Sequence, residues 1–363
     1  MKFNFFVLIF IGTALLSGCA TTGPDVRVIE PVAATEVRAV TSTGPDEYGR
    51  ELRDAPHSMD EGMMQELRDN VPKMSDMSHR AIMGMMRAMG PNYAWYVSPD
   101  DAQANYGVLL LAHGFGQHGD TVLANRIQTV AADTPTAMSL GMSMMGSDHI
   151  QLALNKLAAT GVEDVIVVPV VSTRYNTMLR QWDYILGLQD SAEYATVKRV
   201  TPPVRLHVVR PIEDHPLVGD ALLDYVAEIS ENPANEDVII VAHGPVFEDD
   251  NVLQLAMLRR IGDYIEARSD YNSISVATLQ DDAVEEVRAA NVERLRARVS
   301  QSMAEGRDVL VITNLLGTRM VQSSLRRDLK GLDYRFNAKG LIEHDNFISW
   351  IEQSVAGVAA NLN

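Results

Sequence analysis

The chain has 363 residues, of which 46% are hydrophobic and 22% charged, a balance typical of a globular protein with a full hydrophobic core. Its 31 lysines and arginines against 48 aspartates and glutamates give a net charge of −17, which argues against nucleic acid as a partner because a phosphate-binding surface needs an excess of cations. The length is sufficient for two domains of roughly 130 residues and an additional segment.

The amino end has the pattern of a secretory signal: Lys2 precedes an apolar run over residues 3–16 that is too short to span a bilayer. Leu16-Ser17-Gly18-Cys19 resembles the bacterial lipoprotein box. The resemblance implies removal of residues 1–18, lipidation of Cys19 and anchoring to a bacterial envelope membrane on the periplasmic side, with Ala20 favouring the outer membrane. Cys19 is the only cysteine, so the chain forms no internal disulfide.

Two segments are expected before the first domain. Residues 19–58 are rich in Thr, Pro, Ala and acidic residues without apolar periodicity, which predicts a flexible tether. Residues 59–105 form a methionine-rich helical extension, in which one helix face ends before Gly90-Pro91 and carries Ile82, Met85, Met86 and Met89. This face is interpreted either as an adaptable apolar surface that packs on the domains or as a soft-metal site, for example for copper, assisted by His79.

The first domain is expected over residues 106–230. Its first strand is predicted from Val108-Leu109-Leu110-Leu111-Ala112, a wholly apolar run that leads into His113-Gly114. Further segments alternate between strand and helix patterns, which indicates parallel βαβ units. Strands are expected over residues 136–141, 165–171 and 206–209, and helices over 121–132 and 148–160.

The second domain, residues 231–363, repeats this order. The run Val238-Ile239-Ile240-Val241-Ala242 leads into His243-Gly244, and His243 and His344 are 101 residues apart, as against 102 for His113 and His215. We therefore predict an internal duplication and an α/β fold of two tandem doubly wound parallel-sheet domains. His215 and His344 precede helices and are expected to cap or pack. Helices are expected over residues 251–267 and 284–303, and strands over 275–278 and 309–313.

His113 and His243 are the main candidate site residues, because ligands of parallel sheets bind beyond the carboxyl ends of the strands. The duplicated strand-His-Gly order over residues 106–355 resembles the class II tetrapyrrole chelatases, the sirohydrochlorin cobaltochelatases and ferrochelatases. The resemblance implies two domains facing a cleft and insertion of a divalent metal (Co²⁺, Fe²⁺ or Ni²⁺) into a tetrapyrrole without a nucleotide cofactor. It implies that His113 holds the metal or accepts pyrrole protons, with His243 as the second catalytic candidate. Neutral imidazole suits both tasks.

The sequence departs from the chelatase pattern at the second histidine. Tyr175-Asn176 stands at its place in the first copy and Thr318-Arg319-Met320 in the second. His118 is a candidate replacement nitrogen ligand, with Asp120 as an oxygen ligand or proton acceptor. The alternative is a non-catalytic envelope lipoprotein that binds a metal or a tetrapyrrole, which the export signal also favours because tetrapyrrole synthesis is normally cytoplasmic.

Other enzyme classes lack their sequence signatures. His113-Gly114-Phe115-Gly116 resembles the oxyanion-hole segment of α/β-hydrolases, but Gly141-Met142-Ser143-Met144-Met145 lacks the second glycine of a nucleophile elbow. The phosphate-loop and dinucleotide-binding fingerprints are also absent.

Overall fold

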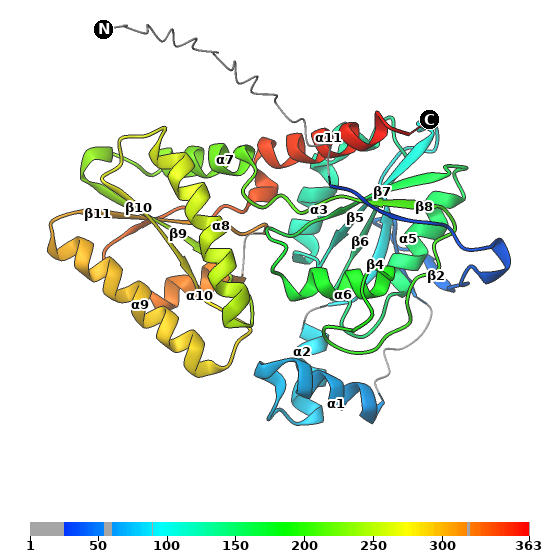
Figure 1. The fold of residues 1–363 in the computed structure, drawn as a ribbon, viewed down its shortest axis with the longest axis horizontal. Coiled ribbons are helices and arrows are strands. Elements are labelled where there is room, and N and C mark those ends of the chain that lie inside the picture. The colour runs from blue at the N-terminus through cyan, green and yellow to red at the C-terminus, as the bar shows by residue number, and fades with distance from the viewer. Residues whose placement is uncertain (1–24, 54–59, 89, 318–319, 363) are drawn as a thin grey trace, which may run out of the picture.

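The computed structural model describes residues 25–53, 60–88, 90–317 and 320–362, so the predicted signal peptide and Cys19 lie outside the described residues. Two α/β units stand side by side, each built on its own sheet (Figure 1). None of the helices in the described ranges combines the length and apolar character needed to cross a membrane.

The first sheet, as far as the chain is described, has eight strands in the order β1-β8-β7-β5-β6-β4-β3-β2. Its parallel centre is formed by β5 (Tyr106–Ala112), β6 (Thr136–Leu140), β7 (Asp164–Pro169) and β8 (Arg205–Val208). Antiparallel strands flank this centre on both sides: β1 (Arg27–Ile29), β2 (Ser42–Pro45), β3 (Arg50–Arg53) and β4 (Tyr93–Tyr96). The four central strands lie where the apolar runs predict them.

The second sheet has four parallel strands in the described part of the chain, in the order β10-β9-β11-β12. They are β9 (Glu236–Ala242), β10 (Ser273–Thr278), β11 (Asp308–Thr313) and β12 (Arg335–Phe336). This order matches β6-β5-β7-β8 of the first sheet, strand for strand. The predicted fold class is therefore confirmed, although β12 is too short to have been recognised as a strand from its sequence.

The helices of the first half are α3 (Gly116–Arg126), α4 (Gln128–Ala131), α5 (Asp148–Ala158), α6 (Thr177–Leu186) and α7 (Pro216–Ala227). Those of the second half are α8 (Glu248–Glu266), α9 (Glu285–Ala304), α10 (Met320–Asp328) and α11 (Asp345–Ala359). The predicted helices are present, but α3 begins at Gly116 rather than at residue 121. His118 therefore lies in the first turn of a helix and not in a loop.

One hydrophobic core joins the two sheets. It contains Leu110 of β5 and Ile240 of β9, together with Leu222 of α7 and Ile351 of α11. The opposite face of each sheet has a core of its own, covered by α5 and α6 in the first half and by α9 and α10 in the second. Because burial of apolar surface dominates folding free energy, we expect the two halves to unfold as one unit.

The last helix of each half packs on the other half. Helix α7 follows β8 but contacts β11 and α8, whereas the C-terminal α11 contacts β7 of the first sheet (Figure 1). The predicted boundary at residue 230 lies between the two sheets, and α7 and α11 each pack across it. A sequence pattern gives a helix's amphipathic face but not which sheet that face covers.

His215 and His344 cap these two exchanged helices. The Nδ1 atom of His215 accepts a hydrogen bond from the Leu217 backbone N–H at 3.3 Å, and that of His344 accepts one from Asn346 at 3.2 Å. Such bonds satisfy free N–H groups of the first helical turn. The expected capping role of both histidines is confirmed.

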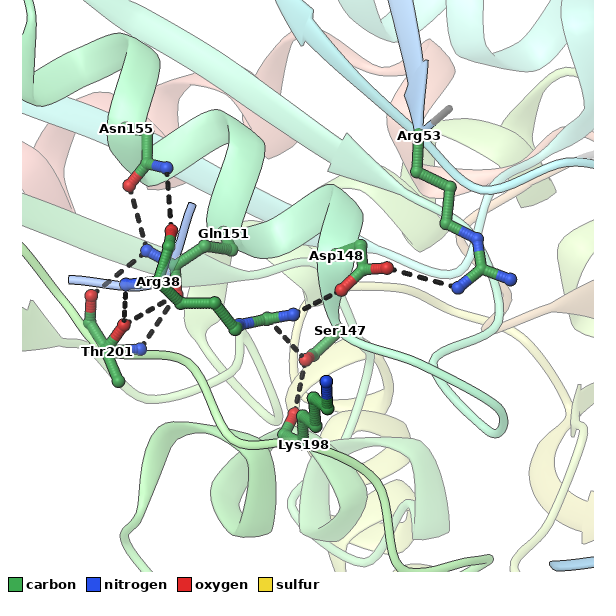
Figure 2. Close-up of polar contacts among 8 residues, drawn as sticks. All are labelled: Arg38, Arg53, Ser147, Asp148, Gln151, Asn155, Lys198 and Thr201. Atoms are coloured by element: carbon green, nitrogen blue, oxygen red, sulfur yellow. Dashed lines mark hydrogen bonds and ion pairs between the residues drawn. The ribbon is translucent and has the colours of Figure 1, made fainter. Parts of the chain in front are cut away.

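Residues 25–53 are a folded part of the first half, which corrects the prediction of a flexible tether for this part of residues 19–58. Strands β1, β2 and β3 pair into the first sheet. Arg38 bonds to Asp148 and, at 2.9 Å, to the hydroxyl of Ser147, and its backbone N–H donates to Thr201 at 2.6 Å (Figure 2). Specific pairing of polar side chains thus orders a segment whose low apolar content suggests disorder.

Asp148 holds two arginines of this segment. Besides Arg38 it accepts a hydrogen bond from Arg53 at 3.1 Å (Figure 2). Burial raises the pKa of Asp148, but the hydrogen bonds and charges of Arg53 and Arg38 outweigh burial and lower it. The stabilisation of the folded state by ionised Asp148 is therefore complete above the pKa of about 3.9 that this carboxyl has in the unfolded chain. It is lost as the pH falls through the lower pKa of the folded state.

Replacing Asp148 by asparagine is expected to reduce the free energy of unfolding by about 2 kcal/mol, because two charge-assisted hydrogen bonds are weakened. Urea denaturation measures the loss, and limited trypsin digestion at Arg38 reports release of the segment. An unchanged midpoint and an unchanged cleavage rate would show that the segment is held by strand pairing alone.

The methionine-rich extension forms α1 (Glu61–Asn70) and α2 (His79–Ala88). Ile82 and Met86 of the predicted helix face are buried, as are Met64 and Met74, and all belong to the core on the outer face of the first sheet. Met89 lies outside the described residues. Burial among apolar side chains supports the packing interpretation over the soft-metal site.

Candidate active site

The two candidate histidines occupy equivalent positions at the carboxyl ends of the central strands. β5 ends at Ala112 and β9 at Ala242, and each is followed by a histidine and then by a glycine with positive φ, +84° at Gly114 and +82° at Gly244. The left-handed backbone turns the chain away from the sheet directly after the imidazole.

His243 has a fixed tautomer. Its Nδ1 lies 2.8 Å from the carbonyl oxygen of Gly244, and because a carbonyl only accepts, Nδ1 carries the proton. Nε2 is left with a lone pair and lies 3.5 Å from a carboxylate oxygen of Asp282. The ring is partly exposed, so Nε2 can accept a proton or bind a cation.

The pKa of His113 is lowered, chiefly by burial and further by the electrostatic influence of His243, which outweigh the opposing effects of a hydrogen bond with the Gly114 backbone and of Asp120. His113 is consequently neutral at neutral pH and retains a lone pair for a metal or a proton.

The loops that carry the histidines are in contact with the opposite half. The ring of Phe115 packs edge-on against His113 with centroids 4.9 Å apart. The same ring lies against Gly317, after β11, where an added Cβ would come within 2.6 Å of it. Arg180 of α6 and Asp250 of α8 form an ion pair at 2.8 Å across the same junction. These contacts fix the position of one histidine loop relative to the other.

Asp120 and His118 do not join His113 as a ligand set. Asp120 is buried and accepts hydrogen bonds from the Tyr93 hydroxyl and the Phe115 backbone N–H, both at 2.6 Å, so it stabilises the loop instead. His118 is exposed on α3. Within the described ranges, no group of three or more His, Cys, Asp and Glu side chains is placed to hold a metal ion.

In the first half, the residue at the expected position of the second loop histidine, Asn176, has a structural role. The side chain of Asn176 accepts from the Met178 backbone N–H at 2.8 Å and caps α6. In the second half, Thr318 and Arg319 lie outside the described residues.

Asp282 is a site residue that the sequence interpretation missed. It follows β10 by four residues, at the same sheet edge as His243, so the rule applied to β5 and β9 also points to this loop. Gln280 in the loop has a positive φ of 51°, and its side chain accepts hydrogen bonds from Asn251 and Asn291. These bonds hold the loop beside His243.

Asn314 is a second residue that was not recognised. It follows β11 and is 1% exposed, yet neither its amide nitrogen nor its amide oxygen has a hydrogen-bonding partner among the described residues. Its backbone N–H donates to Val241, just as that of Val170 donates to Leu111 in the first half. The equivalent position thus carries an apolar side chain in one half and an unpaired amide in the other.

Replacing Asn314 by valine is expected to increase the free energy of unfolding by about 1 kcal/mol, because a buried amide without partners is removed. Val170→Asn is the matched control and is expected to destabilise by roughly 2 kcal/mol. Chemical denaturation measures both variants. A destabilised Asn314→Val variant would mean that the amide has a stabilising partner in solution.

Two surface grooves in the described part of the chain lie away from these histidines. One of about 540 Å³ is lined by Arg126, Tyr225, Lys339 and His344, among others, and one of about 380 Å³ runs along α8. Ser143 is fully buried and bonds to His149 at 3.1 Å and to Trp182 at 3.0 Å, so it is no accessible nucleophile. Donor chemistry therefore places the candidate site at His113 and His243.

No family model matches the chain. A stretch of 97 residues, 26% of the chain, is 31% identical to the sirohydrochlorin cobaltochelatase of Methanothermobacter thermautotrophicus and covers 68% of that protein. The chain belongs to the class II chelatase family. The predicted resemblance to this family is thereby confirmed.

One solved structure supports the fold, and a second is more distant. SirB from Bacillus subtilis with Fe³⁺ matches 71% of this chain and 98% of its own length with a TM-score of 0.52 and 14% identity, which shows the fold alone. A multi-domain protein from Deinococcus radiodurans, described as structurally similar to chelatases, matches 71% of this chain and 55% of its own length at 18% identity and a TM-score of 0.44.

Proposed function

We propose that this protein inserts a divalent metal, Co²⁺, Fe²⁺ or Ni²⁺, into a sirohydrochlorin-like tetrapyrrole, with the metal held by His113. The observation that carries the proposal is the pair of imidazoles at equivalent positions after β5 and β9, in a chain of the chelatase family. The curated relative of this chain is named for cobalt and sirohydrochlorin. We extend the insertion of a divalent metal to this chain, but we do not choose among the three metals.

The two histidines divide the chemistry. Insertion exchanges one divalent cation for the two protons on the pyrrole nitrogens, so the site needs a metal donor and a proton acceptor. His113, whose pKa is lowered chiefly by burial, supplies an exchangeable neutral nitrogen ligand. His243 presents the bare Nε2 as the proton acceptor: it takes the two pyrrole protons one after the other and passes each to solvent by way of the exposed Asp282 carboxylate at 3.5 Å.

The test is the rate at which the purified chain without residues 1–18 converts sirohydrochlorin and Co²⁺ to the metallated product, followed by absorbance. The proposal requires a rate above that of the metal and macrocycle alone. A rate equal to the uncatalysed one, for Co²⁺, Fe²⁺ and Ni²⁺ alike, would contradict it.

A second candidate function is binding without turnover, as an envelope metal- or tetrapyrrole-binding protein. It is supported by Asn176, which caps a helix at the expected position of the second loop histidine, and by the lack of a three-donor cluster among the described residues. Calorimetric binding of Co²⁺ or sirohydrochlorin without product formation favours this function over catalysis.

We also propose that Cys19 is lipidated and anchors the chain to the periplasmic face of an envelope membrane, with the outer membrane favoured by Ala20. Likewise we propose that the halves arose by duplication. The matching strand orders and the two capping histidines support that origin.

A further inference from the structure

The methionine-rich extension lies against both halves beside the candidate site. On the first half, Asn70 donates to the Tyr194 carbonyl at 2.9 Å and Glu66 accepts from the Thr196 backbone N–H at 2.5 Å. On the second half, Lys73, in the short turn after α1, donates to the Asp281 carbonyl at 2.8 Å. The extension therefore bridges the junction, and Lys73 is its contact with the loop that holds Asp282.

Lys73 is two contacts away from the candidate catalytic imidazole. Its Nζ lies 3.5 Å from one oxygen of Asp282, whose other oxygen lies 3.5 Å from Nε2 of His243. The side chains of Lys73 and Asp282 are 48% and 52% exposed, so the ammonium group faces solvent. A loose, exposed pair of this kind contributes little stability and exchanges its partner readily.

Two neighbouring arginines are committed to carboxylates. Arg180 pairs with Glu193 and Asp250, both at 2.8 Å, and Arg288 pairs with Asp281 and Asp328, both at 2.7 Å. Each arginine thus serves two acidic groups at normal ion-pair distance. Lys73 has one distant carboxylate, which leaves it able to bind a further anion.

We propose that Lys73 is a specificity-determining residue that binds a peripheral carboxylate of an anionic tetrapyrrole at the His113–His243 site. The inference rests on the proposed function and names the residue of the extension that recognises the carboxylate substituents of the macrocycle. The ammonium group exchanges Asp282 for the substrate carboxylate. An exposed stretch of carboxylates that includes Glu248, Asp249 and Asp282 otherwise repels such a substrate, so one mobile cation has a large effect on its affinity.

The test is the Kd of uroporphyrin, a polycarboxylate probe, measured by fluorescence on the intact mature chain. Lys73→Gln is expected to weaken binding about tenfold, which corresponds to about 1.4 kcal/mol, whereas Lys73→Arg keeps the charge and binds like the wild type. Lys330→Gln removes an exposed lysine that follows α10, at the opposite edge of the second sheet, and is the charge-matched control with no expected effect.

Binding of Co²⁺ alone and the thermal midpoint separate recognition from folding, and neither should change in Lys73→Gln. The inference is overturned if this variant binds uroporphyrin like the wild type, if Lys73→Arg loses as much affinity as Lys73→Gln, or if Co²⁺ binding and stability fall in parallel. A wild-type protein that binds neither uroporphyrin nor sirohydrochlorin would overturn the proposed function together with this inference.

Discussion

Replacing His113 by alanine is expected to lower the rate of metal insertion about 10³-fold, to near the uncatalysed rate. The variant loses the neutral imidazole that follows β5. His113 lies after the end of β5 and not within the sheet, so the fold is expected to survive, and circular dichroism checks this. The initial rate with sirohydrochlorin and Co²⁺ is the measurement.

His118→Ala is the matched control, because it removes an exposed imidazole five residues further along the chain. It is expected to leave the rate unchanged, and an equal loss in both variants would contradict the assignment to His113. The pH profile gives a further check. Since burial lowers the pKa of His113 from 6.5, its metal-binding neutral form persists to lower pH, and we expect the acid limb of activity below pH 6.5.

Replacing Gly244 by alanine is expected to reduce the free energy of unfolding by about 3 kcal/mol and to disable His243. Gly244 has a φ of +82°, and an added Cβ would lie 2.8 Å from the backbone nitrogen of Gln280 and 2.9 Å from Cβ of Thr278. Strain in the left-handed backbone and overpacking by the added methyl group therefore both destabilise the variant. Urea denaturation measures the stability, and the insertion rate measures the effect on the site.

Gly114→Ala separates the two sources of strain. Gly114 has nearly the same φ, +84°, but the nearest atom to an added Cβ is 3.8 Å away. Gly114→Ala is therefore expected to reduce the free energy of unfolding by about 1 kcal/mol, from backbone strain alone. Equal losses in the two variants would show that packing against Gln280 is not the reason for the glycine at position 244.

The parallel centre of each sheet was predictable because its strands are buried on both faces, so their sequences are continuous apolar runs such as Val238–Ala242. The flanking antiparallel strands were not, because β1, β2 and β3 are partly exposed and mix polar with apolar residues, as in Arg50-Glu51-Leu52-Arg53. Their order depends on tertiary partners, above all Asp148, that lie about a hundred residues away.

The candidate site was predictable only where local sequence determines it. A histidine directly after a buried strand is placed by that strand, which is why His113 and His243 were found. The neighbours of His243 come from separate segments: Asp282 from the loop after β10, and Lys73 from the extension. Asp120 was taken as a ligand because sequence spacing does not reveal that Tyr93 and the Phe115 N–H already bind it.

The central claim is that His113 holds the cation while His243 accepts the pyrrole protons. X-ray absorption of the Co²⁺-loaded protein tests it most directly, comparing the wild type with His113→Ala and His243→Ala. We expect an imidazole nitrogen at ~2.1 Å from cobalt in the wild type and in His243→Ala, and its loss in His113→Ala. An identical cobalt environment in all three proteins, or one without nitrogen from imidazole, would contradict the account.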